Sequence, residues 1–362
     1  MTTVGIITFH RASNYGAVLQ AYALQRVING LGARAVIVDY RSEAVEGDHN
    51  PTMAIRAGGL AGAPLRYLRR KAKSKGFEDF RRVYLPLSEP VTSGDISRLD
   101  GKYDLFITGS DQVWSKAFAK LDPVYRLEFA ERSRKTSYAC SFGFSEFPTG
   151  SKDAIKKDLS GLEAVSVREA LARDLVQERL DLTARVDVDP TLLLSANDWR
   201  GMARAPRTEK GYILVYTVQP PVGLLGAARA KAAETGLEVV YLNNEHRGNR
   251  DLRHVRYATP EEFLGWFDGA SYVYTNSFHG TVFSIILEKE LVVECRTKKK
   301  YNSRSKALLE LTGLEGREMT ETDAGEGTVN WCDVRERLAV AREGSLAYLR
   351  GLCVGEGAIL DE

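Results

Sequence analysis

The feature that most constrains the fold of this chain is a repeated alternation of short apolar runs with segments of helical period. The apolar runs have the length and the β-branched and aromatic content of buried strands. They cover 4–9, 34–40, 103–109, 135–142, 184–189, 211–217, 237–243, 270–276 and 290–295. Strands joined through helices form parallel sheets with both faces covered, so the sequence predicts an α/β fold.

The alternation is interrupted once, at the polar segment 195–211. A chain of 362 residues is long enough for two domains. We therefore predict two Rossmann-like, doubly wound parallel-sheet domains, 1–200 and 201–362, facing across a cleft. The segment 331–352 reads as a helix and is assigned to the second domain. In such folds ligands bind beyond the carboxyl ends of the strands.

Composition excludes several classes of protein. The chain has 50 basic and 48 acidic residues and no recognition motif for nucleic acid, so no nucleic-acid partner is expected. No apolar run approaches the ~20 residues of a membrane span, and residues 1–10 lack the features of a signal peptide. These features predict a cytoplasmic protein. The oligomeric state is not indicated.

The cysteines and histidines give no metal or redox signal. Cys140, Cys295, Cys332 and Cys353 are not spaced as a zinc clamp or a redox CxxC, which favours free thiols. The five histidines are scattered and no HExxH occurs, so no metal is expected.

The segment 64–82 is basic and carries apolar residues at helical spacing. One interpretation is a solvated helix that lies on the first domain. The other is an amphipathic patch in weak contact with an anionic membrane or a charged glycan.

The segment after the first strand is polar and leads into a helix. Asn14 is a plausible N-cap, followed by Tyr15 and Gly16, and Gly16 would allow close approach to the backbone. A helix N-terminus suits an anion, although no GxGxxG fingerprint is present. A simple capped helix is the alternative.

A second polar turn follows the strand 103–109. It places a hydroxyl, a carboxylate and an amide where a ligand would bind, and it contains Gly109, Ser110, Asp111, Gln112 and Trp114. Buried polar groups are costly unless they are hydrogen-bonded, which favours a binding role. The alternative is that Asp111 only caps the next turn.

The strongest local pattern lies at 274–290. A strand ends, Ser277 and His279 occupy the turn, and Gly280 begins an apolar helix. His279 is thus predicted beside a helix N-terminus, where backbone N–H groups could bind phosphate. A structural histidine is the alternative.

Cations occur at two further strand-to-helix junctions. Arg168 follows an apolar run in the first domain. In the second domain, Lys298, Lys299 and Lys300 precede Asn302 and Arg304. A cation at either junction could bind a dianion, and the remaining lysines would be solvated.

Six motifs occur in an order that resembles the polysaccharide pyruvyl transferase family. They are NYGAVLQAYALQ (14–25), FITGSDQVW (106–114), SVRE (166–169), DPTLLL (189–194), NSFHGTVFSI (276–285) and NSR (302–304). The resemblance covers about residues 4–314. It implies the two-domain architecture of GT-B glycosyltransferases. It also implies transfer of a pyruvyl group from phosphoenolpyruvate to two hydroxyls of a sugar, which forms a cyclic ketal.

The resemblance places the family's active-site histidine at His279. From the chemistry of the reaction, our hypothesis is that His279 is the general acid, either for the methylene carbon or for the departing phosphate. Asp111 would accept a proton from a sugar hydroxyl or orient the sugar. Some members carry Arg-Leu-His where this chain has Ser277-Phe278-His279, so Arg168 and Arg304 become the candidates for the positive charge. The predicted donor-binding set is Arg168, Arg304, Ser277, Gly280 and Asn302, and the acceptor or cleft set is Asn14, Tyr15, Gly16, Gly109, Ser110, Gln112 and Trp114.

The partners implied are phosphoenolpyruvate as co-substrate and a sugar or glycan acceptor, free or lipid-linked, with no cofactor and no metal. Three alternatives stay open at this point. The first is a GT-B-like glycosyltransferase that uses a nucleotide sugar, with Glu294 binding the ribose. The second is a family member that acts on a non-polysaccharide metabolite. The third is a binding module without activity, which the presence of His279 and Asp111 disfavours.

Overall fold

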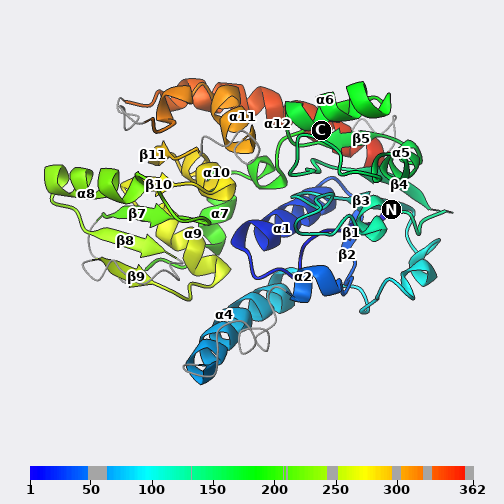
Figure 1. Ribbon diagram of the computed structural model, residues 1–362, viewed down its shortest axis with the longest axis horizontal. Helices are drawn as coiled ribbons and strands as arrows, with labels where there is room; N and C mark the ends of the chain where they lie inside the picture. The colour runs from blue at the N-terminus through cyan, green and yellow to red at the C-terminus, as the bar shows by residue number, and fades with distance from the viewer. Residues whose placement is uncertain are drawn as a thin grey trace. The chain divides into compact units, whose positions relative to one another are not determined.

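The computed structural model groups the chain into two compact units. It describes residues 1–47, 63–131, 133–206, 208, 211–242, 252–295, 303–320 and 328–354. The first unit comprises Met1–Ser74, Glu78–Leu193 and Val340–Glu362, and the second comprises Lys75–Phe77 and Leu194–Ala339. Each unit contains its own parallel sheet with helices around it (Figure 1). The predicted α/β fold with two doubly wound parallel sheets is confirmed.

The sheet of the first unit has the strand order β2-β1-β3-β4, and all of its pairings are parallel. A parallel pair, β5-β6, continues it, because backbone hydrogen bonds join Cys140, just after β4, to Ser166 and Arg168. The strands are β1 Thr3–Ile7, β2 Arg34–Ile37, β3 Leu105–Thr108, β4 Arg134–Ser137, β5 Val165–Val167 and β6 Ala184–Val186.

Helices connect the strands of the first unit. The α-helices are α1 Tyr15–Gly30, α2 Glu43–Gly47, α4 Ala63–Tyr84, α5 Lys152–Ser160 and α6 Ala170–Leu180. Three 3₁₀ helices are η1 Ile96–Leu99, η2 Pro123–Arg126 and η3 Pro190–Leu193. All four residues of β3 are buried, as expected for a strand covered on both faces.

The strand order reverses between β1 and β3. The chain passes from β1 to β2 on one side and then returns to place β3 on the other side of β1. Ile7 and Thr108 are paired at the carboxyl ends of these strands. Such a topological switch point is where open parallel sheets bind ligands.

The second unit repeats this arrangement in the order β11-β10-β7-β8-β9, again with parallel pairings. Its strands are β7 Ile213–Tyr216, β8 Val239–Leu242, β9 Arg253–Val255, β10 Tyr272–Thr275 and β11 Glu290–Val293. Its helices are α7 Ala196–Met202, α8 Leu224–Thr235, α9 Pro260–Asp268, α10 Phe278–Ile286, α11 Ser303–Thr312 and the 3₁₀ helix η4 Glu315–Arg317. The switch point lies between β7 and β10, where Tyr216 pairs with Thr275.

The last helix, α12 (Trp331–Val354), belongs to both units. The sequence assigned 331–352 to the second domain, whereas the structure groups the helix from Val340 onward with the first unit. Specific contacts explain the difference. Ser345 Oγ accepts a hydrogen bond from Val188 N at 3.1 Å, and Tyr348 Oη donates to Ser137 O at 3.0 Å. Leu349 is fully buried.

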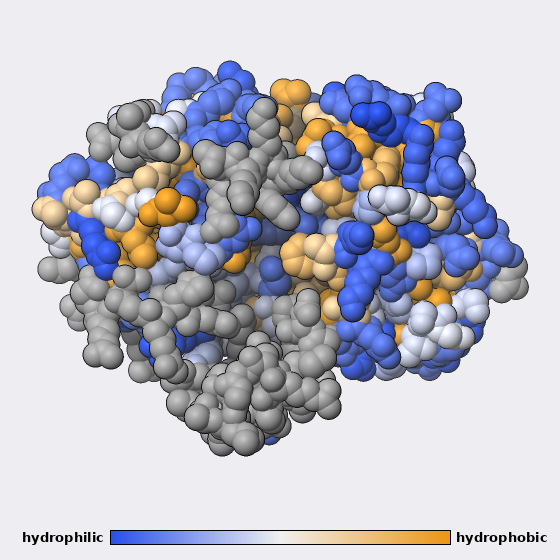
Figure 2. All heavy atoms as spheres, viewed as in Figure 1, coloured by the Kyte–Doolittle hydropathy of each residue, from blue (hydrophilic) through white to orange (hydrophobic). Residues whose placement is uncertain are grey.

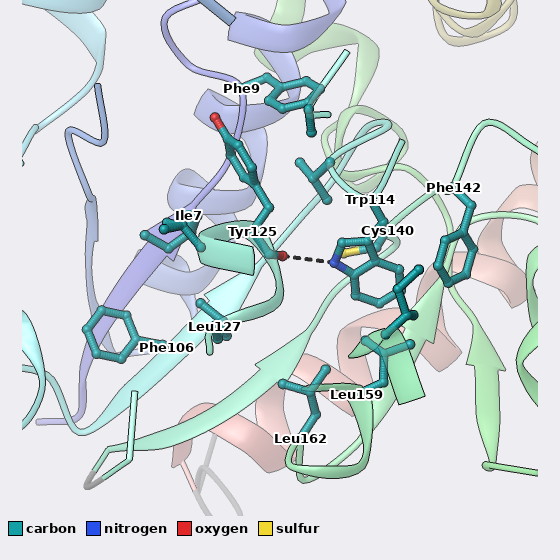
Figure 3. Packing of buried hydrophobic residues seen from close by; sticks show 14 of the residues in the cluster. Ile7, Phe9, Phe106, Trp114, Tyr125, Leu127, Cys140, Phe142, Leu159 and Leu162 are labelled. Atoms are coloured by element: carbon teal, nitrogen blue, oxygen red, sulfur yellow. Dashed lines mark hydrogen bonds between the residues drawn. The ribbon is translucent and has the colours of Figure 1, made fainter. Parts of the chain in front are cut away.

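A cluster of buried hydrophobic residues in the first unit includes Trp114 (Figure 3). The indole Nε1 of Trp114 donates to Tyr125 O at 2.8 Å, and Tyr125 packs edge-to-face against Phe9 at 5.0 Å between ring centroids. Trp114 is 1% exposed, so the structure places it in the core, although it was predicted in the cleft set. A buried indole needs an acceptor for its N–H, and Tyr125 O provides it.

Hydrophilic side chains cover most of the described part of the face seen in Figure 2, with hydrophobic residues between them. Among the described helices, none combines the length and the apolar content that a membrane span requires.

Candidate functional site

The turn that follows β10 is fixed by hydrogen bonds at the switch point of the second sheet. Thr275 Oγ1 donates to Tyr216 O on β7 at 2.7 Å and accepts from Ser277 N at 3.1 Å. Ser277 is the N-cap of α10 and accepts from Gly280 N at 3.3 Å. The Ser277 hydroxyl therefore satisfies one of the N–H groups that the first turn of the helix leaves unpaired.

His279 lies in the first turn of α10. It is 7% exposed, and its ring packs edge-on against Phe278 at 5.1 Å between centroids. The N-terminus of α10 carries the partial positive charge of the helix dipole. An anion bound there would meet backbone N–H groups and the imidazole together.

Gly280 is required for packing. A Cβ at this position would lie 2.2 Å from Thr275 Oγ1 and 3.1 Å from the Tyr216 ring. The helix can therefore approach the ends of β7 and β10 only with glycine here.

Asn276, the residue after β10, fixes the next loop. Its Oδ1 accepts from Val218 N at 3.0 Å, and its Nδ2 donates to Gln219 O at 3.0 Å. The segment that follows β7 is thus tied to the turn that carries His279. Asn276 is the first residue of the NSFHGTVFSI motif, but sequence reasoning gave it no role.

Arg304, the predicted donor-binding cation of the second unit, lies at the start of α11. Its guanidinium carbon is 5.5 Å from the centroid of the Phe278 ring, a distance typical of a cation–π contact. This contact places a positive charge next to the residue that precedes His279. Asn302 and the lysines at 298–300 lie outside the described residues.

Glu294, the residue after β11, caps helix α8. Its Oε1 accepts from Val222 N at 3.0 Å, Gly223 N at 2.6 Å and Leu224 N at 3.1 Å. The N-terminal N–H groups of α8 are therefore satisfied by a carboxylate of the chain itself. This is the helix that follows β7, the strand at the switch point.

In the first unit, Asp111 follows β3 in a left-handed backbone conformation with φ of 75°. Its side chain is 13% exposed, and its Oδ1 accepts from Gln112 N at 2.8 Å and from Arg168 Nη2 at 3.4 Å. The preceding turn requires Gly109, which has φ of 129°, because a Cβ there would lie 2.0 Å from Tyr138 O. This turn holds the Asp111 carboxylate at the carboxyl end of β3.

Arg168 is buried among three carboxylates. Its Nη1 donates to Asp189 Oδ2 at 2.6 Å, and its Nε lies 3.8 Å from Glu169 Oε2, in addition to its contact with Asp111. Burial alone would lower the pKa of Arg168, but Asp189, Asp111 and Glu169 outweigh it and raise that pKa. Arg168 therefore holds Asp111 in place and is already engaged by anionic groups of the protein.

Ser110 belongs to the same buried network. Its Oγ donates to Ala139 O at 2.7 Å and lies 3.4 Å from Asp189 Oδ2, and its N donates to Gln20 Oε1 at 3.0 Å. Ser110 is fully buried, so its hydroxyl supports the turn. Gln112 is only partly buried and lies over Gly143, where a Cβ would be 2.5 Å from Gln112 Oε1.

The remaining predicted acceptor residues begin α1. Asn14 is exposed and caps the helix by accepting from Ala17 N at 3.4 Å. Tyr15 is 1% exposed, and Gly16 is also buried. Of these three residues, Asn14 presents its side chain to solvent.

Sequence reasoning missed two of the three carboxylates that surround Arg168, Glu169 and Asp189. Glu169 is the last residue of SVRE and Asp189 the first of DPTLLL, so both lie in recognised motifs. Spacing along the chain does not reveal that they meet at one guanidinium. Sequence reasoning also missed a cluster after β1 and β2, in which His10 and Arg11 bind Asp39.

The predicted catalytic residues thus occupy equivalent positions in the two units. Asp111 follows β3 beside β1, and His279 follows β10 beside β7. Each lies at the carboxyl edge of its sheet, next to the switch point. Within the described residues, no group of three or more His, Cys, Asp and Glu side chains is arranged to hold a metal ion.

A family model described as polysaccharide pyruvyl transferase matches residues 14–293. No curated protein matches the chain significantly.

Solved structures similar in fold share little sequence with the chain. A UDP complex of S. aureus MnaA has 11% identity, covers 98% of this chain and 91% of its own, and gives a TM-score of 0.48. The UDP-GlcNAc 2-epimerase of Neisseria meningitidis, bound to UDP-GlcNAc, has 10% identity, covers 98% and 95%, and gives 0.47. MurG of Acinetobacter baumannii has 10% identity, covers 98% and 99%, and gives 0.42.

Proposed function

Because the chain belongs to the polysaccharide pyruvyl transferase family, we propose that it transfers a pyruvyl group from phosphoenolpyruvate to two hydroxyls of a sugar. The product is a cyclic ketal, and inorganic phosphate is released. The observation that carries this proposal is the position of His279 in the capped first turn of α10, at the switch point of the second sheet.

Phosphoenolpyruvate carries a phosphate and a carboxylate, so its site needs cations and N–H donors. The N-terminus of α10 provides the donors, and Arg304 provides a positive charge beside Phe278. We also propose Asn302, which belongs to the NSR motif together with Arg304, as a donor-binding residue. Ser277 fixes the turn by capping α10, and Gly280 allows this helix to approach the ends of β7 and β10 closely.

The reaction requires two proton movements. His279 donates a proton to the methylene carbon of phosphoenolpyruvate, while a sugar hydroxyl attacks C2 and gives its proton to Asp111. The result is a tetrahedral carbon that bears the sugar oxygen and the phosphate. A second hydroxyl of the sugar then displaces phosphate, which carries away that hydroxyl's proton. A positioned acid or base contributes roughly 10²–10⁴-fold to the rate.

We assign Arg168 a positioning role for Asp111. It is buried, and its charge is shared by Asp189, Asp111 and Glu169, so a donor phosphate would have to compete with these carboxylates. Asn14 and Gln112 are the predicted acceptor residues that reach the surface, and we propose that they contact the sugar.

The alternative of a nucleotide-sugar donor is disfavoured by Glu294. The nucleotide phosphates of a doubly wound domain are expected at the N-terminus of a helix at the switch point. At α8 this position is filled by the Glu294 carboxylate, which also makes Glu294 a poor ligand for a ribose. A metabolite acceptor in place of a polysaccharide would leave the donor chemistry unchanged.

The proposal is tested by incubating the full chain with phosphoenolpyruvate and candidate sugar acceptors. We expect phosphate release that requires the acceptor, and a ketal-bearing product by mass spectrometry. Release of phosphate with uridine nucleotides as the only effective donor class, or no release with any acceptor while phosphoenolpyruvate binds elsewhere than His279, would contradict it. A cytoplasmic location, membrane contact through 64–82 and the lack of a cofactor stay predictions.

A further inference from the structure

Arg81, near the end of helix α4, is a buried cation with little compensation. It is 6% exposed. Among the described residues its one hydrogen bond runs from Nη1 to His10 O at 3.5 Å, and it forms no salt bridge with them. A guanidinium has five N–H donors, and burying such a charge is costly unless it is paired and hydrogen-bonded.

Among the residues that the structure describes, the groups around Arg81 do not supply a paired anion. Asp39 is 2% exposed and is bound by both Arg11 and His10. Its Oδ1 accepts from Arg11 Nε at 2.7 Å and lies 3.0 Å from His10 Nε2. The other nitrogen of His10 lies 3.1 Å from Thr8 O, so both ring nitrogens face acceptors.

Two more carboxylates act on Arg81 from a distance. Glu46 is paired with Arg41, and Glu78 is exposed. Burial and the nearby charge of Arg11 together lower the pKa of Arg81 to about 10. The hydrogen bonds of the buried Asp39 carboxylate thus go to Arg11 and His10, and Arg81 lies near it without such a bond.

The position of this cluster is that of a ligand site. His10 and Arg11 follow β1, and Asp39 follows β2, at the carboxyl edge of the first sheet. Thr8 links the cluster to the turn of Asp111, because its Oγ1 donates to Ser110 O at 3.3 Å. A cation on this edge is therefore connected to the proposed acceptor side.

We infer that Arg81, beside Arg11, binds an oxyanion of the acceptor, a phosphate or a carboxylate. Guanidinium groups match both anions by paired N–H donors. The acceptor would then be an acidic sugar or a sugar phosphate. The assignment to the acceptor rests on the proposed function, whereas the anion site itself does not.

The test is calorimetric titration of the full chain with glucose 1-phosphate, glucuronate and glucose. We expect at least one of the anionic sugars to bind about tenfold or more tightly than glucose, and Arg81→Gln to abolish this difference. Arg82→Gln is the matched control, because Arg82 is its neighbour on α4 and is exposed, with Asp79 as partner. It should bind as the wild type does. Equal binding of all three sugars by the wild type, or unchanged preference in Arg81→Gln, would overturn the inference.

Stability separates a binding role from a structural one. If Arg81 is held for a ligand, Arg81→Gln and Arg81→Met should melt, without ligand, at or above the wild-type temperature, since function and stability trade against each other at such sites. A lower melting temperature in both would show that Arg81 is structural and overturn the inference. Arg81→Lys keeps the charge without the paired donors and should show intermediate affinity.

Phosphoenolpyruvate binding separates this inference from the proposed function. Its affinity should be the same in Arg81→Gln and the wild type, because the donor is assigned to the second unit. An equal loss of phosphoenolpyruvate binding would place the donor at Arg81 and overturn the acceptor assignment. If the wild type prefers anionic sugars through Arg81 but releases no phosphate from phosphoenolpyruvate, the proposed function fails while the anion site stands.

Discussion

Arg168 and Asp189 form a buried ion pair, with Nη1 2.6 Å from Oδ2 and side chains 2% and 0% exposed. The same guanidinium contacts Asp111, so the pair positions the proposed base. Removing one partner of a buried pair leaves an uncompensated charge. The pair therefore links stability of the first unit to turnover.

We predict that Asp189→Asn lowers the free energy of unfolding by ~3–5 kcal/mol and also lowers turnover. Urea unfolding and phosphate-release kinetics would measure both effects. Asp174→Asn is the matched control, because Asp174 forms an exposed pair with Arg173 and should cost about 0–1 kcal/mol. A loss in Asp189→Asn no larger than that of the control would contradict the prediction.

His279→Ala should lower kcat by roughly 10²–10⁴-fold, because the proposed proton donor is lost. The fold should persist, since Ser277, Thr275 and Gly280 fix the turn through other contacts. Phosphate release would measure kcat, and circular dichroism would show whether the fold persists. His254→Ala, on β9 of the same unit, should keep activity. Wild-type kcat in His279→Ala would remove His279 from proton transfer.

Gly109→Ala should severely destabilise the first unit. Its φ of 129° is strained for alanine, and the added Cβ would meet Tyr138 O at 2.0 Å. Gly226→Ala, inside α8 with nothing within 4 Å of the added Cβ, should instead stabilise by about 0.5–1 kcal/mol. Thermal melting of both variants would show whether the two substitutions change stability in opposite directions. Similar melting temperatures would refute the assigned role of Gly109.

Glu294→Ala should leave the N–H groups of Val222, Gly223 and Leu224 without their acceptor. We expect a loss of ~1–3 kcal/mol in the free energy of unfolding. Inorganic phosphate should then raise the melting temperature of the variant more than that of the wild type, because an anion can replace the carboxylate. An identical response to phosphate in both proteins would show that the end of α8 is not available to anions.

We predict that the first unit loses stability in acid as the Asp39 carboxylate becomes protonated. Burial alone would raise the pKa of Asp39, but its hydrogen bonds with His10 and Arg11 hold that pKa well below its usual range. With an unfolded value of ~3.9, this stabilisation is complete above about pH 5 and is lost as the pH falls toward the folded value.

Asp39→Asn should therefore flatten the dependence of unfolding free energy on pH below about pH 5. Urea unfolding at a series of pH values measures the slope. Asp79→Asn, which alters an exposed pair with Arg82, is the control and should follow the wild-type curve. The same steepness in Asp39→Asn and the control would speak against this role of the His10–Asp39–Arg11 cluster.

The strands that form the two sheet centres could be predicted from the sequence because they are short apolar runs. β3 and β10 both follow this rule, and Asp111 lies in the turn after β3 as expected. His279 was expected in the turn after β10, but it lies in the first turn of α10, which begins at Phe278 rather than at Gly280. β5 was expected only as the apolar run that precedes Arg168, and β9 was missed. β9 has three residues, of which Val255 alone is apolar, so it gives no strand signal of its own.

The contacts within the candidate site were less predictable than its position. Trp114 was placed among ligand-binding residues because of its polar neighbours, yet it packs in the core, as Tyr125 O provides its acceptor. Glu294 and Arg168 were read as ligand-binding residues, but each binds a group of the protein from another part of the chain. Such pairings arise from the tertiary fold, and local pattern does not encode them.

Helix α12 limits how this chain can be divided into separately expressed halves. Its later turns, with Ser345, Tyr348 and Leu349, pack into the first unit. A gene fragment that stops at Leu193 would therefore lack part of its own interior. A stable N-terminal half would require these turns to be fused back onto it, or supplied as a separate peptide.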